Sequence, residues 1–309
     1  MSGADSVRVT PLAALTVAVL AASTSAILVR WSVAPSSVAA LYRVLFTTLI
    51  VAPIAFVGYR EEFGRLSRRD LVGATVAGVA LAVHFATWFE SLNHTSVAAS
   101  VTLVQTQPIF VAIGAVVLLG ERVSRMTVAG IVVAICGAAA MSFGDAGEAP
   151  LSDATAFGNA LALVGAVTLA AYVLSGRSIR QRVSLFPYVV VVYSACTITL
   201  AIFVGVQGHS YTAYPGREWI LFLAMAILPG VFGHTVINWT LEYLRSVVVS
   251  VGWLGEPVGS TILALVLLAE VPDAITVVGG VIVLVGIAVT TIDREGGDEV
   301  TPPPKPPGG

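Results

Sequence analysis

The sequence predicts an all-α polytopic membrane protein with ten transmembrane helices, arranged as two inverted five-helix repeats. Three observations support this fold class: the composition, the recurrence of long apolar runs, and the similarity between the two halves of the chain. Of the 309 residues, 57% are hydrophobic and 11% are charged, and the mean hydropathy is +0.91. Soluble domains are about 25% charged. A cytosolic enzyme, a secreted disulfide scaffold and a disordered chain are therefore disfavoured.

Ten apolar runs have about the 20 residues that a helix needs to cross a bilayer. A β-barrel strand would instead alternate apolar and polar residues, and stretches such as 189–192 and 263–268 do not alternate. We therefore expect ten helices joined by short loops. In chain order, the runs cover residues 11–29, 36–58, 71–92, 96–119, 126–143, 154–175, 185–206, 219–241, 246–268 and 274–292.

The first run has some features of a signal peptide, because Arg8 precedes it and small residues of the cleavage type occupy positions 21–26. Its apolar stretch is longer than the core of a usual signal and continues to Val29. The internal repeat also requires this run as the partner of the sixth. We therefore predict a transmembrane helix here.

The basic residues of the loops and tails gather on one side of the predicted membrane. With a cytoplasmic N-terminus, 13 of the 16 Arg and Lys residues are cytoplasmic, only Arg30 and Arg217 are external, and Arg43 lies within the second run. Cytoplasmic loops of membrane proteins carry an excess of Lys and Arg. We therefore predict a multi-pass protein of the cell membrane with both termini in the cytoplasm.

The fourth and fifth runs resemble the ninth and tenth runs. Residues 108–141 and 257–290 align without a gap at an offset of 149, with 13 identities in 34 positions. The identities include residues that an apolar composition does not favour. Examples are the pairs Pro108/Pro257, Glu121/Glu270, Thr127/Thr276, Gly130/Gly279 and Gly137/Gly286.

The repeat predicts the domain organisation. A first repeat (1–143, helices 1–5) is followed by an external linker (144–153), a second repeat (154–292, helices 6–10) and a disordered, proline-rich cytoplasmic tail (293–309). Five is an odd number, so the second repeat begins on the opposite side of the membrane. Inverted repeats are typical of secondary transporters, whose substrate site lies near the bilayer midplane between the repeats.

Two motifs carry a resemblance to a known family. Pro108 with Gly120-Glu121-Arg122 downstream, and Leu254-Gly255-Glu256-Pro257 with Leu267-Leu268-Ala269-Glu270 downstream, resemble the first-half and second-half motifs of EamA-domain proteins. Arg43 in the second helix resembles a further feature of that family. The resemblance covers nearly the whole chain. It implies the drug/metabolite transporter superfamily, with ten helices, cytoplasmic termini and, often, export of amino acids or other small metabolites.

Glu256 is the strongest candidate for a functional acid, because ionisable groups deep in a bilayer are costly and are usually functional. It lies about 15 Å into the ninth helix at 1.5 Å per residue, and Pro257 is expected to kink the helix there. Burial disfavours the charged form of a carboxyl, so Glu256 is a candidate for proton coupling or for contact with a substrate ammonium group. The alternative is a structural acid bonded to a neighbouring helix. Gln107 occupies the equivalent position in the first half.

Two histidines occupy roughly related positions in the third and eighth helices. His84 and His234 each have a partner at i+4, Trp88 and Asn238, so each pair shares one helix face. Pro229 and two glycines precede or flank His234, and such interruptions indicate transporter sites. We expect both histidines to face the cavity, or else to act as structural histidines that pack the two halves together.

The remaining candidates complete a predicted substrate cavity. Arg43 is expected to bind a substrate carboxylate, with pairing to Glu90 or loop closure as the alternatives. Polar stripes on the first helix (Thr16, Ser23 and Thr24) and on the sixth (Thr168, Tyr172 and Ser175), and the indole of Trp239, are weaker candidates for lining, because Ser and Thr also join membrane helices. The predicted cavity residues are Arg43, His84, Trp88, Gln107, Tyr172, His234, Asn238 and Trp253, with Glu256 for proton coupling.

These features favour a secondary transporter of a small organic metabolite such as an amino acid, with proton antiport as the coupling. The alternatives are an uncoupled facilitator and a non-transporting scaffold or sensor. An enzyme is not expected, since the sequence has no His-Glu-x-x-His, Gly-x-Ser-x-Gly or Walker motif. We expect no cofactor, metal or disulfide, and no nucleic-acid partner. The expected partners are the small-molecule substrate and the lipid bilayer, with the protein a monomer or a homodimer.

Overall fold

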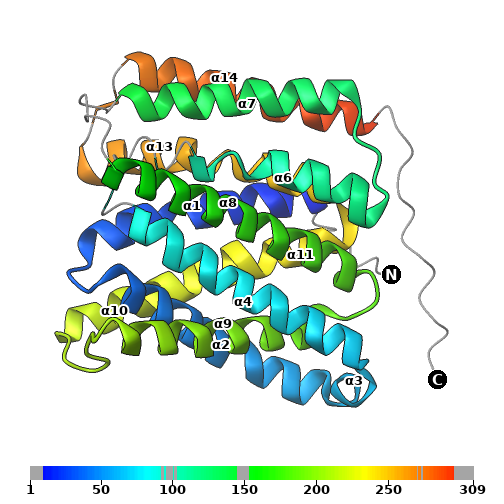
Figure 1. Cartoon of the computed structure of the whole chain (residues 1–309), viewed down its shortest axis with the longest axis vertical. Helices are drawn as coiled ribbons and strands as arrows, with labels where there is room; N and C mark the ends of the chain where they lie inside the picture. The colour runs from blue at the N-terminus through cyan, green and yellow to red at the C-terminus, as the bar shows by residue number, and fades with distance from the viewer. Residues whose placement is uncertain are drawn as a thin grey trace, which may run out of the picture.

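The computed structural model is a bundle of apolar helices packed roughly parallel and antiparallel to one another (Figure 1). It describes residues 10–91, 94, 100, 103–144, 153–269, 271–272 and 274–295, and this part of the chain contains no strand. Seven helical stretches within it are long and apolar enough to cross a membrane, and residues 107–119, 125–141 and 274–290 form shorter apolar helices. The predicted all-helical membrane class is confirmed.

The helices follow the predicted apolar runs closely. In the first half they are α1 (Pro11–Trp31), α2 (Ser36–Gly58), the short α3 (Arg60–Arg65), α4 (Arg68–Ser91), α6 (Gln107–Gly114), the π-helical η1 (Ala115–Leu119) and α7 (Arg125–Gly144). In the second half they are α8 (Asp153–Arg180), α9 (Leu185–Val206), α10 (Gly216–Met225), the π-helical η2 (Ala226–Thr235), α11 (Val236–Tyr243), α12 (Ser246–Trp253), α13 (Glu256–Leu268) and α14 (Ala274–Glu295).

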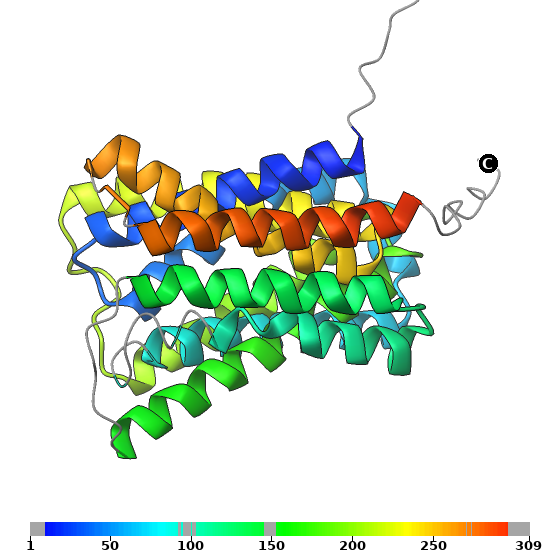
Figure 2. The ribbon, with the colours of Figure 1, turned by 90° about the horizontal axis from the view of Figure 1, so that it is seen from above.

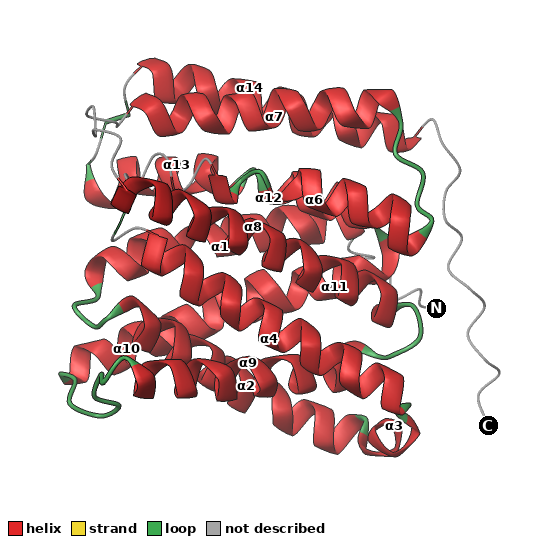
Figure 3. Ribbon diagram, viewed as in Figure 1, coloured by secondary structure: helices red, strands yellow, loops and turns green. Residues whose placement is uncertain are grey.

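Local chemistry explains where several helices begin. The Thr10 hydroxyl accepts a hydrogen bond from the Ala13 N–H at 3.3 Å, and Pro11 occupies the first helical position of α1. Pro35 starts α2 in the same way that Pro215 starts α10, because proline has no N–H to leave unpaired. Short connections such as 32–35, 181–184 and 244–245 join several of the helices (Figure 3).

Two helices are interrupted at equivalent points of the repeat. Leu254 and Gly255 form a turn between α12 and α13, and Gln105 and Thr106 form a turn before α6. Each turn is followed by a polar residue and a proline, Glu256-Pro257 or Gln107-Pro108. Proline removes a backbone donor from the helical ladder, so the helix restarts at this point with its N-terminus inside the bundle. The kink expected at Pro257 is thus a complete break.

α7 and α14 form a separate antiparallel pair along one edge of the bundle (Figures 1 and 2). A Cβ atom added to Gly130 would lie 2.9 Å from the Gly286 carbonyl oxygen, and one added to Gly286 would lie 2.7 Å from that of Gly130. Gly137 and Gly279 are related in the same reciprocal way: a Cβ atom added to either would lie 2.7 Å from the carbonyl oxygen of the other. These four glycines are two repeat-related pairs, so the contact is reciprocal about an approximate two-fold axis.

The two ends of the bundle differ in charge. α1 begins and α14 ends at the same end (Figure 2), and that end also carries α3 and the connections 66–67, 120–124, 181–184 and 244–245. We call it the arginine-rich end.

Around the bundle, large apolar side chains such as Val117, Ile202, Ile220 and Val266 point outward and are at least half exposed. The predicted external linker lies mostly outside the described residues, and so does all of the predicted tail beyond residue 295.

Candidate functional site

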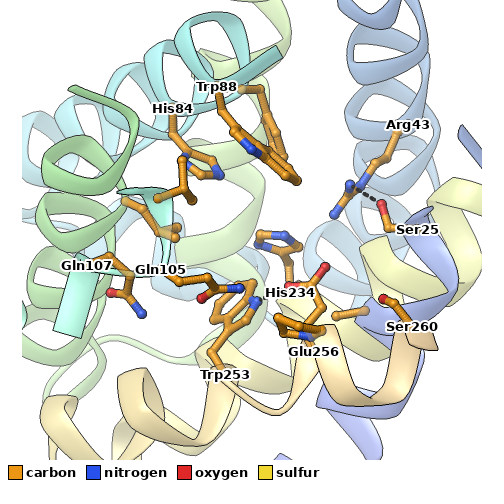
Figure 4. A pocket seen from close by; sticks show the side chains of 15 residues that line it. Ser25, Arg43, His84, Trp88, Gln105, Gln107, His234, Trp253, Glu256 and Ser260 are labelled. Carbon is orange, nitrogen blue, oxygen red and sulfur yellow. Dashed lines mark hydrogen bonds between the residues drawn. The ribbon is translucent and has the colours of Figure 1, made fainter. Parts of the chain in front are cut away.

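A cavity of about 180 Å³ lies inside the bundle, bounded by helices of both halves. Side chains from α1, α2, α4, η2 and α13 converge on it, together with residues at the two helix breaks (Figure 4). Its polar and aromatic lining consists of Ser25, Arg43, His84, Phe85, Trp88, Gln105, Gln107, His234, Trp253, Glu256 and Ser260.

Arg43 brings a positive charge to the cavity from α2. Its side chain is 6% exposed, its Nη1 atom donates to the Ser25 hydroxyl at 3.1 Å, and the guanidinium carbon lies 5.0 Å from the centroid of the Phe85 ring. Contact with an aromatic face stabilises a buried cation. The structure pairs Glu90, one predicted alternative partner of Arg43, with His94 at 3.1 Å.

Glu256 brings a negative charge to the same cavity, at the first residue of α13. Its Oε2 atom accepts a hydrogen bond from the Trp253 indole N–H at 2.5 Å, and its backbone carbonyl accepts one from the Ser23 hydroxyl at 3.1 Å. The N-terminus of a helix favours negative charge. The helix break therefore does two things: it places Glu256 in the cavity, and it supplies a dipole that stabilises an anion there.

The two histidines have different surroundings. His84 Nδ1 bonds to the Gly165 carbonyl oxygen at 3.0 Å, and the ring stacks on Trp88 with centroids 5.7 Å apart. His234 packs edge-on against Trp253 at 4.9 Å, and its buried Nδ1 has no hydrogen-bond partner among the described residues. His84 is therefore anchored to a neighbouring helix by one nitrogen, whereas His234 is held mainly by ring contacts.

Gln107 begins α6 opposite the break before α13. Its Nε2 atom donates to the Ser250 carbonyl at 3.2 Å, and its Oε1 atom has no partner in the described part of the chain. The equivalent residues of the repeat, Gln107 and Glu256, thus both reach the cavity, each from the start of an interrupted helix. One is a neutral amide and the other a carboxylate.

Two predicted cavity residues, Tyr172 and Asn238, are not part of this cavity's lining. Both are completely buried, and the Asn238 side chain donates to the Tyr172 hydroxyl at 2.5 Å and to the His234 carbonyl at 2.8 Å. The i+4 relation of His234 and Asn238 places them one helical turn apart in depth, so only His234 reaches the cavity. The Ser and Thr residues of the predicted polar stripes do not line the cavity either. The hydroxyls of Thr16, Ser23, Thr24 and Thr168 bond to carbonyls of their own helices.

The structure brings four unpredicted polar or aromatic residues to the cavity: Ser25, Phe85, Gln105 and Ser260. Their sequence signals were weak. Phe85 adjoins His84, and Gln105 precedes the Gln107-Pro108 break, so proximity to the predicted residues was the only available indication. Ser25 and Ser260 belong to apolar stretches in which serine is common.

Two ion pairs join different segments of the chain at the arginine-rich end. Arg177 Nε lies 2.8 Å from Glu121 Oε1, with both side chains at most 10% exposed, and Arg180 pairs with Glu242. Glu121 also accepts hydrogen bonds from the Ser246 hydroxyl at 2.8 Å and from the Ser246 N–H at 3.2 Å, at the start of α12. The sixth apolar run predicts a helix end at residue 175, but α8 continues to Arg180, and the two arginines of its last turn pair with these carboxylates.

The comparisons with known proteins agree with this architecture. The family model of the EamA-like transporter family matches the chain twice, at residues 10–143 and 156–292. A solved crystal structure of a protein superposes with a TM-score of 0.79 over 93% of this chain and 99% of that chain, at 18% sequence identity. That similarity supports the fold alone.

Two relatives are similar along most of their length. An uncharacterized transporter of Bacillus subtilis, YxxF, is 21% identical over 267 residues, covering 86% of this chain and 85% of its own. The pseudopaline exporter CntI of Pseudomonas aeruginosa is 24% identical over 256 residues, covering 82% of this chain and 86% of its own. The resemblance inferred from the two sequence motifs is confirmed by the double family match.

Proposed function

Because the chain belongs to the EamA-like transporter family, we propose that it is a secondary transporter that exports a small zwitterionic metabolite, such as an amino acid, in exchange for protons. The family membership and the multiple apolar helices make it a multi-pass membrane transporter of the drug/metabolite superfamily. The substrate class, the direction and the coupling are the parts that we propose.

We propose a ten-helix architecture built from two inverted repeats, with the arginine-rich end in the cytoplasm. Two observations support it. The reciprocal glycine contacts of α7 and α14 are those expected of two equivalent helices related by an axis in the membrane plane. The gathering of arginines at the end where α1 begins and α14 ends favours cytoplasmic termini.

The observation that carries the substrate proposal is the pair of opposite charges facing one small cavity. Arg43 and Glu256 enter from different halves of the protein, and the walls between them include Phe85, Trp88 and Trp253. A guanidinium suits a carboxylate, and a carboxylate with aromatic neighbours suits an ammonium group. A zwitterion would satisfy both charges at once, which matters where water is scarce.

The proposal of proton antiport rests on the position of Glu256. A carboxyl in a cavity bounded by lipid-embedded helices can be neutral or charged, and its charge state changes its interaction with Arg43 and with a bound ammonium group. Protonation from outside would then weaken the hold on an exported zwitterion. The name of the similar CntI protein, an exporter, supports the outward direction.

Solute flux into and out of proteoliposomes tests the proposal, using amino acids first identified by thermal-shift screening. An imposed pH gradient should drive accumulation by the wild type. Glu256→Gln keeps the shape of the side chain but stays neutral and cannot titrate, so the variant should still bind the solute, more weakly than the wild type, and should lose gradient-driven accumulation.

Two outcomes would favour the alternatives. Accumulation by Glu256→Gln at the wild-type level would leave an uncoupled facilitator in which Glu256 is structural. Absence of flux for every solute that binds wild-type protein would favour a non-transporting sensor.

A further inference from the structure

A group of buried polar side chains lies between the cavity and the arginine-rich end. We call it the inner polar cluster; it comprises Tyr172, Tyr188, Tyr193, Thr235 and Asn238, each at most 5% exposed. Asn238 Nδ2 donates to the Tyr172 hydroxyl at 2.5 Å, and the Tyr193 and Thr235 hydroxyls are 3.1 Å apart. No member lines the cavity; Tyr193 borders a separate, minor pocket beside Arg43.

The hydrogen bonds of this region are incomplete. In the described part of the chain, two members of the cluster have unpartnered atoms, Asn238 Oδ1 and the Tyr188 hydroxyl, and so does His234, four residues before Asn238, at Nδ1. Buried polar atoms almost always bind protein or ordered water. Two unpartnered atoms in one buried cluster therefore indicate a polar occupant, and water is the simplest one.

Gly176 shows where two of these atoms converge. A Cβ atom added there would lie 3.3 Å from Asn238 Oδ1 and 3.3 Å from the Tyr188 hydroxyl. The amide oxygen is an acceptor and the phenol can donate or accept, so a water beside Gly176 can bridge them. Leu241 Cδ1 lies 2.8 Å from the same point, so a small rotation of this flexible side chain would widen the site.

The cluster connects the cavity to the ion pairs at the arginine-rich end. His234, Asn238 and Glu242 follow one another at intervals of four residues, on one face of the helix formed by η2 and α11. His234 lines the cavity, the Asn238 carbonyl accepts from Arg180 Nε at 3.1 Å, and Arg180 pairs with Glu242, whose side chain is 35% exposed. A polar route thus runs from the cavity to the end of the bundle.

The repeat gives this route a counterpart. α1, α2 and α4 contribute Ser25, Arg43 and His84 to the cavity, and their equivalents in the second repeat, α8, α9 and the η2–α11 helix, contribute the inner polar cluster. In inverted-repeat transporters, one repeat moves against the other around a shared site. Each repeat would therefore line the pathway on its own side of that site.

We propose that the inner polar cluster holds bound water in this conformation and becomes the cytoplasmic half of the solute pathway when the Arg177–Glu121 and Arg180–Glu242 pairs separate. This inference rests on the proposed transport function. It predicts that a residue buried in the cluster becomes accessible to water from the cytoplasm, whereas an equally buried neighbour outside it does not.

Cysteine accessibility tests the inference without knowledge of the solute. Cys136 and Cys196 are replaced by alanine, and Asn238→Cys or the control Ile237→Cys is added; both positions are 0% exposed on the same helix. A membrane-impermeant thiol reagent is applied to inside-out vesicles. We expect Asn238→Cys to react about tenfold faster than Ile237→Cys, since only the former lines a transiently open pathway. Adding Glu242→Gln, which weakens the closing pair, should raise the rate further.

Equal, slow labelling of both cysteines, with and without Glu242→Gln, would overturn the inference. Size-exclusion chromatography identifies variants that misfold, and the milder Tyr188→Phe variant supplies a second measurement. It removes one hydroxyl and keeps the ring, so solute binding should persist while flux falls; unchanged flux would also count against the inference. Absence of flux with the wild-type protein would instead reject the transport function, and the labelling would still show whether the cluster opens to the cytoplasm.

Discussion

At the scale of single residues, Arg43 is the group on which recognition of a carboxylate depends. A guanidinium has five N–H donors, and Ser25 accepts from Nη1 while the Phe85 face lies against the same group. Insertion of an arginine at mid-membrane costs about 2.5–3.5 kcal/mol. An anionic ligand held by the remaining donors would offset that cost.

Replacing Arg43 with glutamine should weaken the binding of zwitterionic ligands by roughly tenfold to a hundredfold, because hydrogen bonds to charged groups contribute about 1.5–3 kcal/mol. Isothermal titration or thermal shift in detergent measures the change. Ser25→Ala, which removes only the neighbour of Arg43, should have a smaller effect. Unchanged affinity of Arg43→Gln for every amino acid that binds the wild type would reject the carboxylate-clamp proposal.

A second residue-scale contrast concerns the ion pairs. Arg177→Gln leaves Glu121 buried without its cation, which should destabilise the protein by about 3–5 kcal/mol. Arg182 is 44% exposed where it pairs with Asp70, so Arg182→Gln should cost about 0–1 kcal/mol. Unfolding in detergent would compare the two variants, and equal losses would contradict the structural difference between the pairs.

At the scale of elements, close packing of α7 on α14 depends on glycines that leave room for a neighbouring backbone. A Cβ atom on Gly279 would lie 2.6 Å from the Met141 nitrogen and 2.7 Å from the Gly137 oxygen, and neither atom can rotate away. The adjacent Gly280 has ordinary space, with its nearest neighbours, in the Met141 and Val258 side chains, at 3.8 Å. Small residues allow membrane helices to approach closely.

Gly279→Ala should therefore destabilise the protein by about 1–3 kcal/mol, as overpacking does, whereas Gly280→Ala should be neutral or stabilising by up to about 1 kcal/mol through helix propensity. Thermal unfolding of the two purified variants in the same detergent provides the comparison. If both alanine variants were equally stable, the close contact between α7 and α14 would not be what makes Gly279 important for stability.

At the scale of the whole molecule, the charge asymmetry between the two ends predicts the orientation in the membrane. A reporter that is active only in the cytoplasm should be active when it is fused after Gly309, because positively charged loops remain on the cytoplasmic side. A cysteine placed at position 147, which lies outside the described residues, should react with an impermeant reagent applied to intact cells. Protection of position 147 from outside would overturn the proposed ten-helix topology.

Much of this molecule could be predicted from the sequence because composition, proline position and repeat are local properties. Apart from the fourth run, which lies partly outside the described residues, the apolar runs predicted the helix ends to within a few residues, except that α8 is longer, and Pro257 marked one of the two helix breaks. Proline disrupts a helix wherever it lies in the interior. The positions of Arg43, His84, His234 and Glu256 near mid-helix likewise identified residues that meet at one cavity.

Which way each side chain turns was decided only by tertiary packing. These helices are apolar on all sides, so no hydrophobic face distinguishes inside from outside, and rotation about each helix axis depends on its neighbours. Packing therefore turned Ser25 and Gln105 toward the cavity and Asn238 and Tyr172 away from it. It also buried Arg177 and Arg180, which charge counting had treated as loop residues, because their partners Glu121 and Glu242 come from segments distant in the chain.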